Sequence, residues 1–428
     1  MHYDLLVRNA QIHRQQGLVD IAIHDGSFVR IGADLRDDAT AGREIDAAGR
    51  LVVPPFIDAH VHLDAVLTVG QPRYNTSGTL LEGIQIWSER KPTLTHDDVK
   101  RRALEEIKWE VAQGTLFIRS HVDVCDPNLT ALRALLEVRE EVRDICELQL
   151  VAFPQDGILS FPDGRELMRK AIELGCDVVG GIPHYEWTHD MGVEDVHYAF
   201  ALAKEFNRDI DCHCDETDDP LSRFTEVMAA DTLEQGWQGR VTASHCTAMH
   251  SYDNAYAFKL IGLLARAQVN VVANPFDNIV LQGRFDSYPK RRGITRVKEL
   301  LAAGVNVALG HDSIMDPWFP LGRGDMLAAA QLALFLCHMS GYEEIETMLD
   351  VITTNAARVL RLQDRYGIVE GKPASFLLLD APTAFEALRL LPARLHVFKE
   401  GREVARTIPA QSLLRSNTHE EQEITFRL

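Results

Sequence analysis

From residue 56 to residue 365 the sequence repeats one pattern, a short apolar segment followed by an amphipathic segment with helical spacing. Residues 95–114, for example, open with a Thr cap signal and close with a Gly, and residues 163–175 also end on Gly. Eight apolar segments that alternate with helices predict an α/β fold, the (β/α)₈ TIM barrel. The strand candidates cover residues 56–63, 115–124, 147–155, 177–184, 209–216, 241–246, 269–275 and 305–312.

Shorter alternating segments precede and follow this region. Residues 3–12, 19–32 and 44–54 have Gly and Asp at their turns and predict a small antiparallel sheet, and residues 366–382 and 394–406 predict further short strands. We therefore expect both termini, residues 1–55 and 366–428, to form one small β-sandwich domain, and residues 56–365 to form the catalytic barrel.

The composition disfavours several classes of partner. The formal charge of -19 disfavours nucleic acid and anionic membrane surfaces, because both repel a surface of that average sign. We find no secretory leader and no membrane-spanning run, so we expect a soluble protein of the cytoplasm. The seven cysteines are too scattered for a disulfide scaffold and are expected to be reduced, with Cys212 and Cys214 packed as small apolar residues.

Polar side chains end most of the predicted strands, which is where a barrel places its active site. A lone histidine at a strand end is usually structural, but several strand ends that converge on one mouth favour a shared site. The residues concerned are His60, His62, His121, Gln155, His184, His213, Glu216, His245, His311 and Asp312.

Four of these residues form a possible metal site. His60 and His62 are two positions apart on one strand, so their rings face the same side. A hydrolytic metal site needs three or four nitrogen and oxygen ligands and an open position for water. His60, His62, His213 and Asp312 supply such a set, with His245 within reach of the same mouth.

Together these motifs resemble the amidohydrolase superfamily, and within it the bacterial cytosine deaminases. The resemblance rests on "HVHLD" in the first strand, His213, His245 and "GHDS" in the eighth strand. It extends through "GQPRYNTSGTLLEGI", "VAFPQDGILS", "HCDETDD", "TASHCTAMHSY", "LQGRFDSYPKRRGITRVKE" and "HDSIMDPWFPLG". It implies metal-dependent hydrolytic deamination of a free pyrimidine base in salvage.

The resemblance also implies a role for each matching residue. His60, His62, His213 and Asp312 would hold one divalent ion, Zn²⁺ or Fe²⁺, and the absence of a lysine in "VVGGIPHYE" favours a single ion. Glu216 would shuttle a proton to the ring nitrogen, Asp312 would accept a proton from the attacking water, and His245 would polarise the developing charge. Gln155 would read the amide edge of the base, and Trp318 and Leu80 would line its pocket.

Each of these roles has a plainer alternative. Glu216 lies in the acidic run "DETDD", which is also compatible with a solvated loop, and Gln155 could satisfy only the backbone of its loop. Trp318 and Leu80 are also compatible with ordinary packing. His121 and His184 have no matching ligand role and are expected to be structural or to support the ligands.

One departure from the resemblance concerns substrate choice. The cytosine deaminases carry two consecutive acids after the eighth-strand histidine, whereas this chain has Asp312 followed by Ser313. The second acid is expected to face ring position 5, so serine removes bulk and charge there and leaves room for a methyl group, whose burial is worth roughly 1 kcal/mol. We therefore expect cytosines substituted at position 5, such as 5-methylcytosine, to be accepted; the alternative is that Ser313 only donates a hydrogen bond and cytosine stays preferred.

Other functions stay open at this point. Another amidine-type base, such as isoguanine, presents a similar edge to Gln155, and a ring-opening cyclic amidohydrolase has the same fold, although Glu216 and the missing lysine argue against it. A catalytically inactive binding or assembly protein is the alternative from a different class. An assembly of identical subunits is expected from the resemblance only.

Overall fold

The computed structural model describes residues 2–33, 35, 40–415 and 421–426. The chain divides into two compact units, one of Phe56–Val111 and Thr115–Asp364, the other of Met1–Pro55, Ala112–Gly114 and Arg365–Leu428. Parts of the expected terminal domain, namely residues 1, 34, 36–39, 416–420 and 427–428, lie outside the described residues.

The larger unit contains eight parallel strands that follow one another around the sheet in sequence order. The last strand approaches the first through a parallel bridge between Val61 and Asp312. The Asp312 amide donates to the His60 carbonyl at 2.8 Å, and the His62 amide donates to the Asp312 carbonyl at 3.0 Å. The predicted (β/α)₈ barrel is thereby confirmed. Its strands are β6 (Phe56–Val61), β7 (Thr115–Asp123), β8 (Glu147–Phe153), β9 (Val178–Val179), β10 (Asp209–Cys214), β11 (Val241–His245), β12 (Asn270–Ala273) and β13 (Val307–Leu309).

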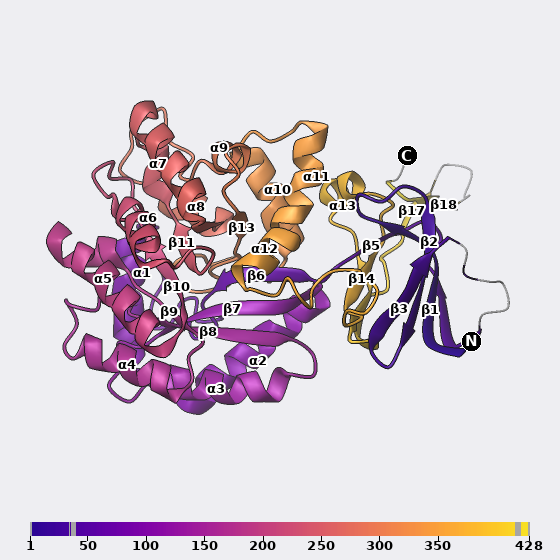
Figure 1. Cartoon of the computed structure of the whole chain (residues 1–428), viewed down its shortest axis with the longest axis horizontal. Coiled ribbons are helices and arrows are strands. Elements are labelled where there is room, and N and C mark those ends of the chain that lie inside the picture. The colour runs from indigo at the N-terminus through magenta and orange to yellow at the C-terminus, as the bar shows by residue number, and fades with distance from the viewer. Residues whose placement is uncertain (1, 34, 36–39, 416–420, 427–428) are drawn as a thin grey trace. The chain divides into compact units, whose positions relative to one another are not determined.

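Helices lie outside the strands of this unit (Figure 1). The predicted Thr signal opens α2, because Thr95 Oγ1 accepts the Asp98 amide at 3.2 Å. Gly175, at φ 123°, ends α4 in a conformation that only glycine adopts readily. The helices are α1 (Leu80–Arg90), α2 (His96–Ala112), α3 (Thr130–Val142), α4 (Gly164–Leu174), α5 (His189–Phe206), α6 (Phe224–Gln235), α7 (Asn254–Ala267), α8 (Pro275–Leu281), α9 (Val297–Ala302), α10 (Met326–Leu336), α11 (Tyr342–Val351) and α12 (Thr354–Val359), with single turns at η1 (Lys91–Thr93), η2 (Pro183–Tyr185) and η3 (Thr247–His250).

The fourth strand is shorter than the predicted segment 177–184. It ends at Val179, and the chain then enters the turn η2. A Cβ on Gly180 would lie 2.3 Å from the Ala152 carbonyl oxygen, so the backbone passes β8 more closely than any other residue would allow. Pro183 cannot donate to a strand ladder and begins η2 instead.

The barrel interior contains a buried ion pair as well as apolar side chains. Arg119, which is 1% exposed, donates to Asp211 Oδ2 at 2.9 Å and to the Val359 carbonyl at 2.9 Å. Asp211 also accepts the Ser244 hydroxyl at 2.7 Å. Because Arg119 and Asp211 each precede a barrel histidine by two residues, this pair lies one layer below the histidines.

The smaller unit is built on one sheet with the strand order β16-β15-β14-β5-β1-β2-β3, in which β4 also pairs with β1. The pairings of β1 with β4 and with β5 are parallel, so the N-terminal strands are not purely antiparallel as expected. Phe28, Phe376 and Phe398 anchor its apolar core. The strands are β1 (His2–Ile12), β2 (Leu18–His24), β3 (Ser27–Gly32), β4 (Thr40–Asp46), β5 (Leu51–Val53), β14 (Phe376–Leu379), β15 (Arg394–Lys399) and β16 (Arg402–Arg406), with the helix α13 (Ala384–Leu390) and a separate hairpin of β17 (Ser412–Arg415) and β18 (Glu421–Ile424).

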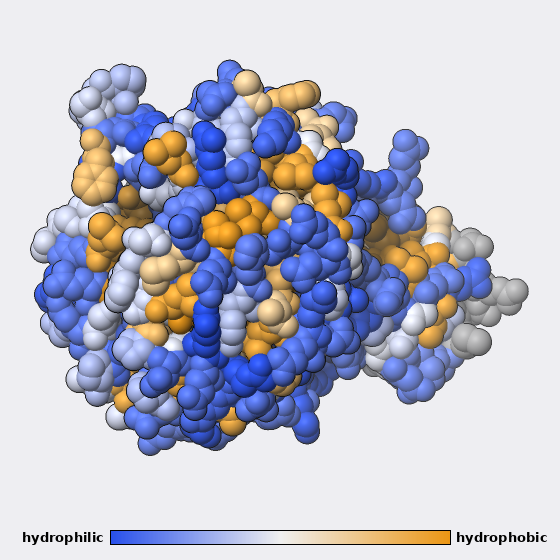
Figure 2. All heavy atoms as spheres, turned by 60° about the vertical axis from the view of Figure 1, so that its left-hand side comes forward, coloured by the Kyte–Doolittle hydropathy of each residue, from blue (hydrophilic) through white to orange (hydrophobic). Residues whose placement is uncertain are grey.

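The hydrophilic character of the surface is consistent with the content of charged residues. In the view of Figure 2 most exposed residues are hydrophilic, with apolar side chains between them. Within the described ranges, none of the helices has both the length and the apolar character that a membrane crossing needs.

Candidate metal centre and base pocket

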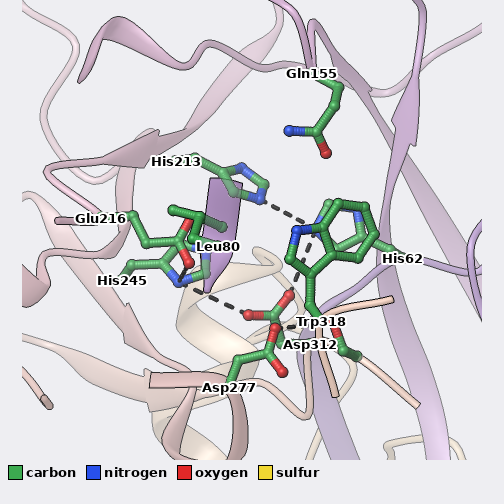
Figure 3. Close-up of a pocket in the computed structure, with 10 residues that line it drawn as sticks. His62, Leu80, Gln155, His213, Glu216, His245, Asp277, Asp312 and Trp318 are labelled. Carbon is green, nitrogen blue, oxygen red and sulfur yellow. Dashed lines mark hydrogen bonds and ion pairs between the residues drawn. The ribbon is translucent and has the colours of Figure 1, made fainter. Parts of the chain in front are cut away.

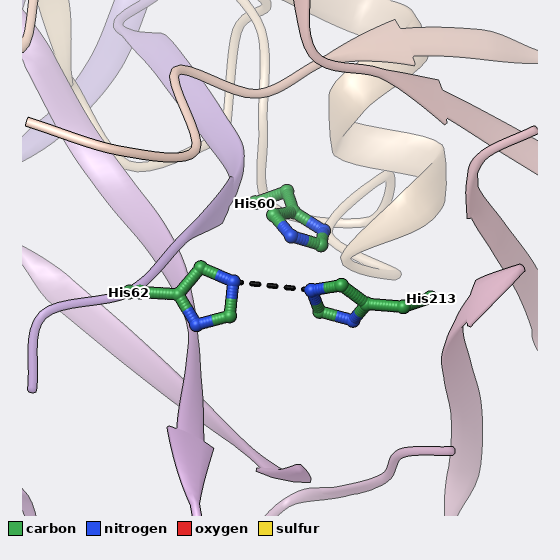
Figure 4. Close-up of side chains that lie close together, drawn as sticks. All are labelled: His60, His62 and His213. Atoms are coloured by element: carbon green, nitrogen blue, oxygen red, sulfur yellow. Dashed lines mark hydrogen bonds between the residues drawn. The ribbon is translucent and has the colours of Figure 1, made fainter. Parts of the chain in front are cut away.

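The predicted metal ligands meet at the carboxyl ends of their strands. His60 lies on β6, His62 one residue beyond it, His213 on β10, and Asp312 after β13. Figure 4 shows the three imidazoles turned toward one another, with His62 Nε2 3.1 Å from His213 Nε2. Asp312 Oδ1 lies 3.5 Å from Nε2 of both His60 and His62. The three histidines form one group that could hold a cation, and Asp312 forms a second such group with His60 and His245.

The chemical state of these side chains fits a divalent ion. Burial lowers the pKa of His62 to about 4, and burial together with the neighbouring rings lowers the pKa of His60 and His213 much further. The imidazoles are therefore neutral, which is the form that binds a metal. Neither ring nitrogen of His60 has a hydrogen-bond partner among the described residues, so a cation would satisfy a buried group that is otherwise left unpaired.

His245, Glu216 and Asp312 lie together beside these histidines. His245 Nδ1 is 3.4 Å from Glu216 Oε1 and 3.7 Å from Asp312 Oδ2. His245 and Asp312 have φ values of 70° and 72°, a left-handed conformation that is rare for residues other than glycine. The backbone bends at these strand ends and aims both side chains into the barrel mouth, as functional residues under local strain often do.

Burial raises the pKa of Glu216 and of Asp312 well above the usual range, and the neighbouring Asp277 carboxyl adds to both shifts. A divalent cation among the histidines acts in the opposite direction, because it stabilises the charged form of a carboxylate. The site thus combines carboxyl groups that hold protons readily with ligands that favour a cation.

These residues line a pocket of about 280 Å³ (Figure 3). All the residues proposed from sequence for binding or catalysis contribute to it, and of the predicted metal ligands only His60 is not among the lining residues. The lining residues are His62, Leu80, Gln155, His213, Glu216, His245, Asp277, Asp312, Ser313 and Trp318.

Two apolar side chains form walls of this pocket. Trp318 is only 7% exposed, and its loop is fixed by Asp316 Oδ1, which accepts the amides of Trp318 at 2.9 Å and Phe319 at 3.0 Å. Trp318 packs onto α1 at Gly83, where a Cβ would lie 2.3 Å from Trp318 Cδ1. Leu80, the first residue of α1, belongs to the same apolar cluster. The position of the Trp318 wall therefore depends on the close approach of its ring to α1, which the missing side chain of Gly83 permits.

Gln155 lies just after β8 and is 6% exposed. The loop that carries it is held by an ion pair between Lys91 and Asp156, and Lys91 also lies 3.0 Å from Asp123. In Figure 3 the Gln155 amide points into the pocket from the end opposite Asp277.

The acidic run after His213 is not a solvated loop. Asp215 is fully buried and accepts the amides of Phe224 and Thr225 at 2.9 Å and the Ser222 hydroxyl at 2.7 Å. This anchoring fixes the chain next to Glu216, which is 4% exposed. Glu216 thus lies in the pocket because Asp215 holds the turn in place.

The remaining candidate residues lie around the centre. His121 is buried and stacks on His60 with ring centroids 3.9 Å apart. Its Nε2 is 3.8 Å from Asp211 Oδ1, and these two residues form with His60 a further group that could hold a cation. His184 lies in η2, where burial lowers its pKa to about 4. Cys212 and Cys214 are fully buried, as small apolar residues would be.

Asp277 is the pocket residue that the sequence analysis did not predict. It lies on α8, just after β12, and its Oδ2 accepts the Ser313 hydroxyl at 2.8 Å. The signal was the acid in "NPFDN" after the seventh strand, the one strand for which no candidate was named. A carboxyl from another strand end, that of Asp277, therefore lies beside Ser313 in this part of the pocket.

The mouth of this (β/α)₈ barrel holds neutral imidazoles and a carboxylate, with an acid beside them. This combination defines a metal-dependent barrel hydrolase. Comparison with known proteins is more specific. The Amidohydrolase family profile matches residues 43–405, so the chain belongs to the amidohydrolase family.

The chain is 32% identical to the N-isopropylammelide isopropyl amidohydrolase of Pseudomonas sp. (strain ADP) over 94% of its own length and 96% of that protein. It is 31% identical to a pterin deaminase of Rhizobium rhizogenes, over 91% and 88% of the two chains. A crystal structure of 5-methylcytosine deaminase from Klebsiella pneumoniae liganded with 5-fluorocytosine matches with a TM-score of 0.92 and 49% identity, and covers 95% of this chain and 98% of that one. The resemblance to cytosine deaminases is thereby confirmed.

Proposed function

We propose that this protein removes the exocyclic amine from a free pyrimidine base by hydrolysis. The substrates are cytosine and cytosines substituted at position 5, such as 5-methylcytosine, and the products are uracil or thymine plus ammonia. The observation that carries the proposal is one pocket that combines the predicted metal ligands, Glu216 and Gln155. The 49% identity to a 5-methylcytosine deaminase supports it.

We assign the metal site to His60, His62, His213 and Asp312, whose ligand types suit one Zn²⁺ or Fe²⁺ ion. When bound, such an ion lowers the pKa of water to about 7 and so supplies the nucleophile at neutral pH. Asp312 would accept a proton from the attacking water, and His245, between Glu216 and Asp312, would stabilise the charge that develops during attack.

Glu216 carries the acid–base step. Attack at the carbon that bears the amine requires a proton on the adjacent ring nitrogen, and departure of ammonia requires a second proton transfer to the amine. Glu216 is buried beside His245, and burial raises its pKa, which suits a group that holds a proton until the ring nitrogen takes it.

Gln155 and the apolar walls orient the base. The Gln155 side chain both donates and accepts, as the N–H and C=O edge of a pyrimidine requires. Trp318 and Leu80 supply apolar contact to the ring, and we place position 5 of the ring near Ser313, which is small enough to leave room for a methyl group. We further propose that the reaction belongs to cytoplasmic pyrimidine salvage and that the protein is a homo-oligomer.

A panel of free bases tests this function. Purified protein is assayed for ammonia release from cytosine, 5-methylcytosine and isoguanine and for ring opening of a cyclic amide, with the metal content measured in parallel. We expect ammonia from cytosine and 5-methylcytosine. Turnover of isoguanine or the cyclic amide alone would assign the pocket to another amidine or amide substrate.

A further inference from the structure

Asp277 has a geometry that the proposed reaction does not yet use. It is 3% exposed and lines the pocket beside Asp312 and Ser313. Its Oδ2 accepts the Ser313 hydroxyl at 2.8 Å, whereas its Oδ1 accepts no hydrogen bond from any described residue. A buried acceptor without a donor is costly, so this oxygen points to a donor on the ligand.

The arrangement of the pocket indicates which part of a base reaches Asp277. In Figure 3 Gln155 and Asp277 stand at opposite ends, with Glu216 and His245 along one side. In a cytosine ring the N1 and O2 edge lies opposite the edge that carries C5 and the exocyclic amine. If Gln155 reads the first edge and Glu216 meets N3, the amine points toward the end that holds Asp277 and Ser313.

Ser313 determines what Asp277 offers to that edge. The serine hydrogen is used in the bond to Asp277 Oδ2, so the hydroxyl presents only lone pairs to a ligand. Burial raises the pKa of Asp277, and the hydrogens of a bound amine would in turn stabilise its ionised, accepting form. Both side chains are then acceptors. A 4-amino group has hydrogens to donate to them, whereas the 4-oxo group of the product has only lone pairs and would face acceptors unpaired.

We propose that Asp277 is a specificity-determining residue that accepts a hydrogen bond from the exocyclic amine and so distinguishes the 4-amino substrate from the 4-oxo product. The inference rests on the proposed function and extends it. Asp277 favours binding of the base before reaction and weakens binding of uracil or thymine afterwards, because a site built to pair a donor rejects the analogue that lacks it.

The test is Asp277→Asn in the metal-loaded full-length enzyme. Asparagine has nearly the same shape; its oxygen can accept the Ser313 hydroxyl while its amide nitrogen turns a donor toward the ligand. We expect KM for cytosine to rise about tenfold and Ki for uracil to fall about tenfold, the effect of one hydrogen bond gained or lost. If Asp277 had a purely structural role, the substitution would weaken the binding of both ligands, and KM and Ki would rise together.

Asp190→Asn is the matched control, because it removes the same charge from a fully exposed side chain on α5 and should leave KM and Ki unchanged. If Asp277→Asn does not fold, Asp277→Ser replaces it; serine is too short to reach the amine, and the preference for cytosine over uracil should disappear.

The outcomes separate this inference from the proposed function. Absence of ammonia release from both cytosine and 5-methylcytosine by the wild type overturns the function and the inference together. A different result overturns only the role of Asp277 and leaves the proposed function intact. In that case the wild type deaminates the bases, but KM and Ki of Asp277→Asn stay constant or rise together.

Discussion

Replacement of Ser313 by aspartate tests how the pocket selects its base. Ser313 is 1% exposed and its hydroxyl oxygen lies 2.8 Å from Asp277 Oδ2. Burial of a 5-methyl group there adds about 1 kcal/mol, which is roughly a fivefold advantage over cytosine. In Ser313→Asp the new carboxylate fills that space and meets Asp277 at close range, where two charges about 4 Å apart repel by about 4 kcal/mol at an effective dielectric of about 20.

The assay is kcat/KM for 5-methylcytosine divided by kcat/KM for cytosine. We expect Ser313→Asp to lower this ratio at least about tenfold. The new side chain fills the space for the 5-methyl group, and its charge repels the Asp277 carboxylate. Ser313→Ala is the control: it removes the hydroxyl without adding bulk or charge, so the ratio should persist. An unchanged ratio in Ser313→Asp would refute the reasoning, as would a wild type that turns over 5-methylcytosine at less than about a hundredth of its rate on cytosine.

Three further predictions concern the acid, the wall and the barrel interior. Glu216→Gln should lower kcat by about 10²-fold or more while KM changes little, as steady-state kinetics will show, because the proton shuttle is lost; a near-normal kcat would remove Glu216 from the mechanism. Gly83→Ala should raise KM for cytosine about tenfold, since the added Cβ would lie 2.3 Å from Trp318 Cδ1 and displace the pocket wall; an unchanged KM would show that Trp318 does not contact the base. Arg119→Gln should destabilise the protein by about 3 kcal/mol in chemical denaturation, because it leaves the buried Asp211 without its partner. Arg101→Gln, which removes a 71% exposed side chain, should have almost no effect, and equal effects of the two would contradict the account of the buried pair.

The sequence pattern predicted the barrel because strand and helix periodicity are local properties. It also led to the proposed metal ligands, since parallel strands of a barrel bring their carboxyl ends to one mouth. His60, His62, His213 and Asp312 lie far apart in the chain, yet a strand-end rule was sufficient to group them.

Features that depend on packing between elements were not predictable in this way. The acid of Asp277 follows the seventh strand, but its contact with Ser313, 36 residues along the chain, could not be inferred from that segment. The short fourth strand follows from the close passage of Gly180 against β8, and the Arg119–Asp211 pair follows from side chains that meet across the barrel interior. In each case the partner belongs to another element, which periodicity along one segment does not reveal.

The most direct test of the central claim is ammonia release by purified protein with its metal content measured before and after chelation. The account predicts about one divalent ion per chain, ammonia from cytosine and 5-methylcytosine, loss of that activity when the ion is removed, and recovery when Zn²⁺ or Fe²⁺ is restored. Ammonia release that persists in metal-free protein, or a metal-loaded protein that deaminates neither base, would contradict it.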